Sequence, residues 1–296
     1  MAWNELTAEP RRHHTETQDE TSEAETAQGA GTQVTTGKGA TGRERTLARL
    51  RLLGAFRLEG ANGDIPVPAN EQRLLAYLGL HNRALRSVVA GTLWPDATEE
   101  RAHGSLRTTL WRLRRLPHPV IGGDGDTLHL MEGVTVDVDD FTRTARRLTG
   151  AMHDQGDAPP PLAALVGGEL LPGWDEEWIS FERERLRQLR LHALESLSAR
   201  LTRLGRYALA LEAALTCVSI EPLRESAQCA VVAVHLAENN VVEAIRHYEA
   251  FRRLLREELG LEPSARFAAM FPYRAKGGTR APSLTASTPE RHDRSG

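Results

Sequence analysis

The chain has 296 residues, of which 40% are hydrophobic and 26% are charged, and its formal net charge is −3. This length predicts two globular domains, each with its own core, and the composition excludes a fibrous or wholly disordered protein. No stretch approaches the about 20 continuous apolar residues of a transmembrane helix, and the first residues lack the apolar centre of a signal peptide. We therefore expect a cytoplasmic protein whose two cysteines, Cys217 and Cys229, are reduced core residues.

The two ends of the chain have compositions that do not favour folding. Residues 1–46 are rich in Thr, Glu, Gly and Ala, and residues 275–296 are rich in Gly, Ser, Thr, Pro and charge. Such segments cannot bury enough apolar surface to offset the entropy lost on ordering. We predict disordered tails at 1–46 and 275–296, and a linker at 148–161 that contains three consecutive prolines.

Residues 47–147 form a first predicted domain, in which strand and helix patterns are separated by turn residues. Ser87 is the predicted N-cap of the second helix, and Asp96 or Thr98 that of the third. A Gly- and Asp-rich turn between two short apolar runs indicates a β-hairpin. The predicted elements are a strand over 50–58, an edge segment over 65–68, helices over 70–79, 87–94 and about 99–115, a hairpin of 120–121 with 127–130, a strand over 134–138 and a helix over 141–148.

The third of these helices combines an apolar stripe with a basic face. Between Arg101 and Gly123 the sequence has five arginines and neither Asp nor Glu. Apolar residues recur at spacings of four, four and three and therefore share one face: Ala102, Leu106, Leu110 and Leu113. A buried stripe opposite an arginine face suits insertion into a DNA major groove, and the structural alternative is a solvated cationic face.

Strands, three helices and a hairpin follow one another in the order of a winged helix, with the third helix as reader and the hairpin as wing. The frame LRLLGAFRLEGANGDIPV, with LW closing the second helix and RLRR closing the third, resembles the OmpR-type winged helix. The domain is close to charge balance, so DNA affinity would depend on where its charges are placed. The residues predicted to contact DNA are Arg101, Arg107, Thr108, Trp111, Arg112, Arg114 and Arg115 in the third helix and at its end, and Thr127 and His129 in the wing.

Residues 162–274 form a second predicted domain, which is helical and contains an internal repeat. Ala244 lies 34 residues after Ala210, which is the tetratricopeptide period, and Asn239 occupies the position of Gly205. Small residues at these positions let paired helices approach closely, and stacked pairs offer surfaces for protein partners. The fold class is therefore mainly α with a small β component: a winged helix-turn-helix followed by a tetratricopeptide-like α-helical repeat domain.

Several strings in this second domain resemble the bacterial transcriptional activation domain. They are Gly168-Glu169-Leu170-Leu171-Pro172, Trp178 with Arg183 and Arg185, Glu221-Pro222-Leu223-Arg224-Glu225, Tyr248, and the stretch from Glu258 to Ser264. Together with the winged helix, they resemble the Streptomyces antibiotic regulatory protein (SARP) family over about 47–274. The resemblance implies a nucleoid-associated activator of secondary-metabolite gene clusters that binds promoter direct repeats as a homodimer and recruits RNA polymerase holoenzyme.

The chain lacks the motifs of the common enzyme classes. It has no phosphate-binding loop of the G-x-x-x-x-G-K-[ST] type, no H-E-x-x-H, and no G-x-S-x-G nucleophile motif. We therefore expect neither enzymatic activity nor a cofactor or metal. Two other hypotheses stay open: a tetratricopeptide-type scaffold without DNA binding, and a regulator that senses a small molecule in its helical domain. A gel-shift assay tests the first alternative, and ligand-dependent melting tests the second.

Overall fold

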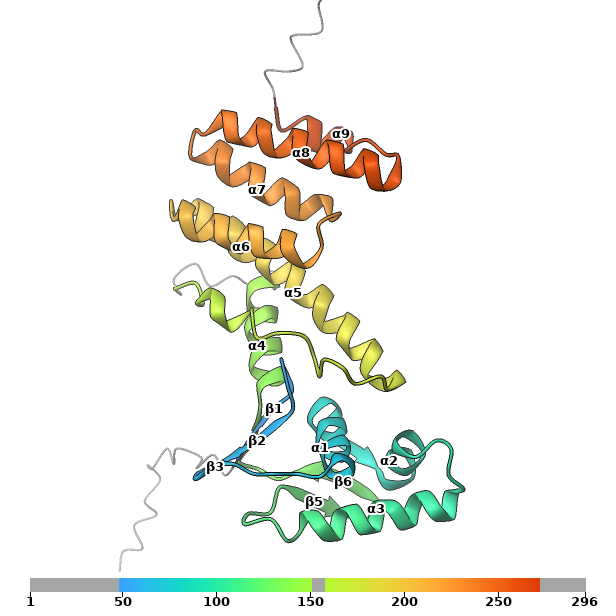
Figure 1. Cartoon of the computed structure of the whole chain (residues 1–296). Helices are drawn as coiled ribbons and strands as arrows, with labels where there is room; N and C mark the ends of the chain where they lie inside the picture. The colour runs from blue at the N-terminus through green and yellow to red at the C-terminus, as the bar shows by residue number, and fades with distance from the viewer. Residues whose placement is uncertain (1–47, 151–157, 272–296) are drawn as a thin grey trace, which may run out of the picture. The chain divides into compact units, whose positions relative to one another are not determined.

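The computed structural model describes residues 48–150 and 158–271 (Figure 1). The predicted tails and the centre of the predicted linker lie outside these ranges. Within them, no helix is both long enough and apolar enough to span a membrane. The elements are β1 Ala48–Arg51, β2 Arg57–Gly60, β3 Gly63–Asp64, α1 Ala69–His81, β4 Arg83–Leu85, α2 Arg86–Leu93, α3 Glu99–Leu113, β5 Ile121–Asp124, β6 Thr127–Leu130, β7 Val134–Val136, α4 Asp137–Thr149, the 3₁₀ turn η1 Leu162–Ala164, α5 Glu177–Arg203, α6 Tyr207–Ile220, α7 Glu225–Ala237, α8 Val241–Leu259 and α9 Ala265–Ala268.

The first strands form a sheet in the order β3-β2-β1-β7, in which β7 pairs with β1 in parallel and the other neighbours are antiparallel. The prediction of one strand over 50–58 is wrong, because the chain turns between β1 and β2. Gly54 has a φ of +84°, which an L side chain rarely adopts, and this permits the turn. The predicted strand over 134–138 is also too long, since Val138 already lies in α4.

Three helices and a second sheet complete the winged helix. Hairpin β5–β6 confirms the predicted wing, and β4, which the sequence did not predict, pairs with β6 to give the order β4-β6-β5. Because β4 runs directly into α2, that helix begins at Arg86, and the prediction of Ser87 as its N-cap is wrong. Thr98 occupies the N-cap position of α3, although its side chain makes no capping hydrogen bond.

The second part of the chain is helical, and α5, α6, α7 and α8 pack successively on one another (Figure 1). Gly205 and Asn239 both have positive φ, +70° and +63°, in the turns that precede α6 and α8. Ala210 and Ala244 are both fully buried. The 34-residue repeat is therefore confirmed, and α8 is longer than α6, with 19 residues against 14.

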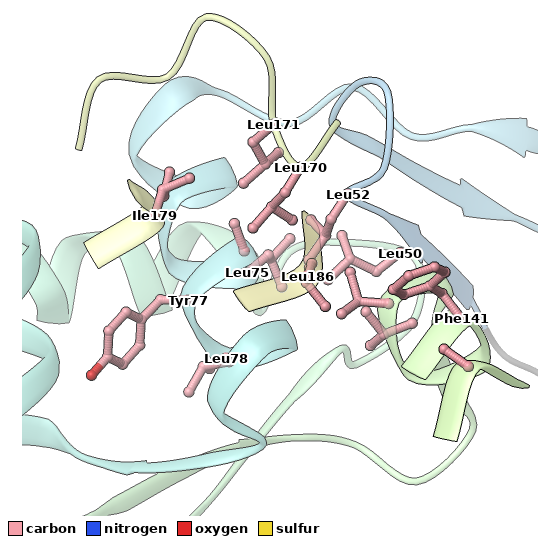
Figure 2. Close-up of a cluster of buried hydrophobic side chains, with 14 of the residues drawn as sticks. Leu50, Leu52, Leu75, Tyr77, Leu78, Phe141, Leu170, Leu171, Ile179 and Leu186 are labelled. Atoms are coloured by element: carbon pink, nitrogen blue, oxygen red, sulfur yellow. The ribbon is translucent and has the colours of Figure 1, made fainter. Parts of the chain in front are cut away.

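The core does not divide as the sequence predicted. One hydrophobic cluster extends from the strands and helices of the winged helix to α5, α6 and α7, so the expectation of a separate core in each domain is wrong. Figure 2 shows Leu50 of β1 and Leu52, which follows it, beside Leu170 and Leu186 of the helical part. A second, smaller cluster joins α8 to Phe267 of α9 and to Phe271.

Candidate nucleic-acid interface

Helix α3 presents its predicted arginine face to solvent. The buried stripe is the predicted one with the addition of Thr109, whose hydroxyl donates a hydrogen bond to the Ser105 carbonyl oxygen over 3.0 Å. Trp111 keeps 52% of its surface exposed, so it does not pack in a domain interface of this chain. The predicted contact residues of α3 and its C-terminal turn are all exposed: Arg101, Arg107, Thr108, Trp111, Arg112, Arg114 and Arg115.

Most of these arginines have no acidic partner in the part of the chain that the structure describes. Within the described residues, Arg101, Arg107, Arg114 and Arg115 have no carboxylate at ion-pair distance, whereas Arg112 lies 3.4 Å from the Glu71 carboxylate. The guanidinium of Arg115 stacks over the Trp111 ring, 3.6 Å from its centroid. Unpaired guanidinium groups on one exposed face are available for an anionic partner such as a phosphate backbone.

An open hollow of about 550 Å³ lies on the wing side of α3. It brings Arg107 and Arg114 together with Arg86, a residue that the sequence analysis missed. The Arg86 Nε donates a hydrogen bond to the Gly125 carbonyl oxygen over 3.3 Å, so the start of α2 is attached to the turn of the wing. An arginine at a helix start is visible in the sequence, but its place beside the wing depends on the pairing of β4 with β6. The lining residues are Arg86, Arg107, Thr108, Leu110, Trp111 and Arg114.

The predicted wing residues do not line this hollow. The Thr127 hydroxyl donates a hydrogen bond to the Asp124 carbonyl oxygen over 2.8 Å and closes the turn. His129 is half-buried, and its Nδ1 has no hydrogen-bond partner among the described residues. The tip also carries the exposed carboxylates of Asp124 and Asp126. The structure therefore gathers the α3 arginines but not Thr127 and His129 with them.

The Gly168–Pro172 string forms the junction between the winged helix and the helical part. The Gly54 amide donates to the Glu169 carbonyl oxygen over 2.7 Å, and the Leu171 amide donates to the Leu52 carbonyl oxygen over 2.9 Å. Gly168 has a φ of +91°, and a Cβ built on it would lie 2.9 Å from the Gly54 Cα. The two backbones therefore approach so closely that only glycine fits at this position.

Charged side chains secure the same junction. Arg183 of α5 donates to the carbonyl oxygens of Leu170, Leu171 and Trp174 over 3.1, 2.9 and 3.1 Å. Arg73 of α1 pairs with Glu176 at 2.6 Å. Arg183 thus binds backbone carbonyl groups that would otherwise be buried without partners.

Asp137, the first residue of α4, is hydrogen-bonded to the segment that follows β1 of the N-terminal sheet. Its two carboxylate oxygens accept the Leu52 and Leu53 amides over 2.9 and 3.1 Å. Burial raises the pKa of this carboxyl above its ordinary value, and the two amides oppose the rise because they stabilise the charged form. Asp137 is thus a structural anchor of α4.

The Glu221–Glu225 string connects the helices of the repeat. Arg224 Nε donates to the Glu195 carboxylate over 2.7 Å, and a Glu225 carboxylate oxygen accepts the Ser264 amide over 2.8 Å. Arg187 of α5 pairs with Glu221. These residues therefore connect successive helices through hydrogen bonds and ion pairs.

The described residues contain no candidate metal-binding cluster, and the thiols of both cysteines are shifted towards their protonated forms. No group of three or more His, Cys, Asp or Glu among them could hold a metal ion. Burial raises the pKa of the Cys217 thiol to about 12 and that of the Cys229 thiol to about 11, which favours the unreactive protonated forms.

Comparison with known proteins identifies the helical part. The family described as "Bacterial transcriptional activator domain" matches residues 136–271. This range includes α4, which the sequence analysis placed in the first domain, and the boundaries proposed there at 147 and 162 stay predictions.

Two individual proteins are similar to the chain. The regulatory protein AfsR of Streptomyces coelicolor is 26% identical over 228 residues, which cover 73% of this chain but only 23% of AfsR. The structure of Mycobacterium tuberculosis EmbR in complex with a low-affinity phosphopeptide has a TM-score of 0.62 at 16% identity, covering 77% of this chain and 65% of EmbR. The EmbR likeness shows a shared fold. The family match over residues 136–271 and the AfsR similarity support the resemblance to the SARP family of bacterial transcriptional activators.

Proposed function

We propose that the chain binds promoter DNA through α3 and the adjoining start of α2, and that its helical part recruits RNA polymerase. The observation that supports DNA binding is the exposed face of α3, on which Arg101, Arg107, Arg114 and Arg115 have no carboxylate partner within the described residues. Such a face would be solvated in a scaffold protein, but its spacing suits phosphates and base edges of one major groove.

The proposed biological role rests on the resemblance to the SARP family. We propose that the protein acts on the nucleoid as a homodimer, recognises direct repeats at promoters of a secondary-metabolite cluster, and makes contact with the polymerase holoenzyme through the repeat surfaces. No step of this role requires a cofactor or a catalytic group. A direct repeat places two protomers in the same orientation on one side of the duplex when half-sites are about 10.5 base pairs apart or a multiple of that.

The test of DNA binding is a fluorescence-anisotropy titration with the protein's own upstream DNA at several salt concentrations. Four or five phosphate contacts would give a log–log slope of about −4 per protomer. Arg107→Ala should make the slope shallower by about 0.9 or, if Arg107 reads a base, lower operator affinity by about 1–3 kcal/mol. The control Arg253→Ala removes an exposed arginine of α8 and should change neither. Affinity that does not change between about 50 and 200 mM salt would contradict the proposal.

The repeat geometry and activation are tested separately. Footprinting should show protection of two repeats in the same orientation, and protection of a palindrome alone would rule out the direct-repeat arrangement. Transcription in vitro with purified holoenzyme should rise when the operator is saturated. No rise at full occupancy would show that the helical part does not recruit polymerase under these conditions.

A further inference from the structure

Glu71 is a buried carboxylate whose partner comes from the reading helix. It lies in the first turn of α1, its side chain is 1% exposed, and its Oε1 is 3.4 Å from Nη1 of Arg112. Its Oε2 is buried and has no hydrogen-bond partner among the described residues. A carboxylate that is shielded from solvent needs a compensating positive charge. This charge is supplied by Arg112 and by the positive end of the α1 helix dipole.

Arg112 consequently differs from the other arginines of α3. It is turned about 100° around the helix from Trp111, towards α1, and it does not line the hollow beside the wing. Its guanidinium is still 54% exposed, so it lies at the edge of the face proposed to meet DNA. Arg107 and Arg114, on the wing side of the same helix, have no such partner within the described residues.

We propose that Glu71 sets the sequence-independent part of DNA affinity by holding Arg112 against α1 and away from the phosphate backbone. This inference rests on the proposed DNA binding and removes Arg112 from the contacts predicted from the sequence. Each phosphate contact contributes to every DNA sequence alike, so withholding one cation lowers non-specific affinity without changing base readout. Glu71 is therefore a specificity-determining residue, and Arg112 is the cation that it withholds from the phosphate backbone.

The experiment measures the salt dependence of binding to a short random-sequence duplex and to the operator, by anisotropy, with the full chain. Glu71→Gln should release Arg112 and make the log–log slope steeper by about 0.9. The random duplex should then bind about fivefold more tightly at about 0.15 M salt, and the ratio of operator to random affinity should fall. The double variant Glu71→Gln with Arg112→Gln should have the slope of the parent. Arg107→Gln, the matched control on the same helix, should have a slope shallower by about 0.9.

The double variant decides the question even if Glu71→Gln alone unfolds, because a neutral pair of similar shape leaves no buried charge. If its slope is shallower than that of the parent by about 0.9, Arg112 already contacts a phosphate and the inference is wrong. A folded Glu71→Gln protein with the parent slope would also overturn it, because a released Arg112 would then not reach DNA. A purely structural role of Glu71 would shift the melting temperature but not the slope. Failure of the parent to bind either duplex at low salt would instead refute the proposed function.

Discussion

The close approach of Gly168 to Gly54 makes a quantitative prediction about the junction between the two parts of the chain. Gly168→Ala adds a Cβ that would lie 2.9 Å from the Gly54 Cα and 3.1 Å from its nitrogen, both backbone atoms that cannot rotate away. The φ of +91° adds strain of about 1–2 kcal/mol for an L side chain. Displacing the packed backbone costs about 1–3 kcal/mol more, so the expected loss in unfolding free energy is about 2–5 kcal/mol.

Gly173 offers a matched control five residues further along the same segment. Its φ is +81°, and a Cβ built on it would meet nothing within 4 Å. Gly173→Ala should therefore show only the conformational strain, about 1–2 kcal/mol. The difference between the two variants isolates the steric contribution of the junction.

The assay is urea unfolding, followed by circular dichroism and by tryptophan fluorescence, to which Trp174 and Trp178 near the junction contribute two of the five tryptophans of the chain. Because one hydrophobic cluster spans both parts, the parent should unfold in a single transition with both probes. If Gly168→Ala is no less stable than Gly173→Ala, the backbone contact does not constrain the junction and the reasoning fails.

Three further outcomes follow from single positions. Gly104→Ala should raise the unfolding free energy by about 0.5–1 kcal/mol, because a Cβ there would meet only an Arg107 side-chain atom at 3.8 Å, and reduced operator affinity in the same variant would show that DNA approaches this glycine. Burial and the neighbouring His235 lower the pKa of His247 from 6.5, so the folded protein binds fewer protons than the unfolded chain. Stability should therefore fall as the pH drops through 6.5, by at most about 1.4 kcal/mol per pH unit from this group, and His247→Gln should flatten that slope in urea titrations between pH 5 and 8. Arg183→Met should lower the unfolding free energy by about 2–3 kcal/mol, because the carbonyl groups that Arg183 binds become unsatisfied. An unchanged urea midpoint would show that water replaces the Arg183 guanidinium.

Features that depend on local periodicity could be predicted from the sequence. The buried stripe of α3 and the exposure of Arg101, Arg107 and Trp111 follow from helical geometry, since residues three and four apart share a face whatever the surroundings are. The equivalence of Gly205 and Asn239 also needed no tertiary information, because both occupy the same position of a repeat and both adopt positive φ. The wing hairpin could be predicted as well, because its turn residues are visible in the sequence.

The sequence alone could not predict which distant segments of the chain pair with one another. Gly54 is the local mark of the central turn in the strand pattern over 50–58, but the turn is stabilised by hydrogen bonds of Gly54 and Leu52 to the segment after Gly168, which the sequence does not reveal. Those contacts close a loop of more than 100 residues, and no short window contains both partners.

The same reason separates Arg112 from its neighbours on α3. In the sequence it is one arginine of a basic stripe. Only the packing of α1 on α3 places the buried Glu71 carboxylate beside Arg112. The desolvated charge of Glu71 then attracts the Arg112 guanidinium, an attraction that the other arginines of α3 do not experience. Helical periodicity fixes which side chains share a face, but their partners are fixed by tertiary packing, because charge compensation depends on distance in space.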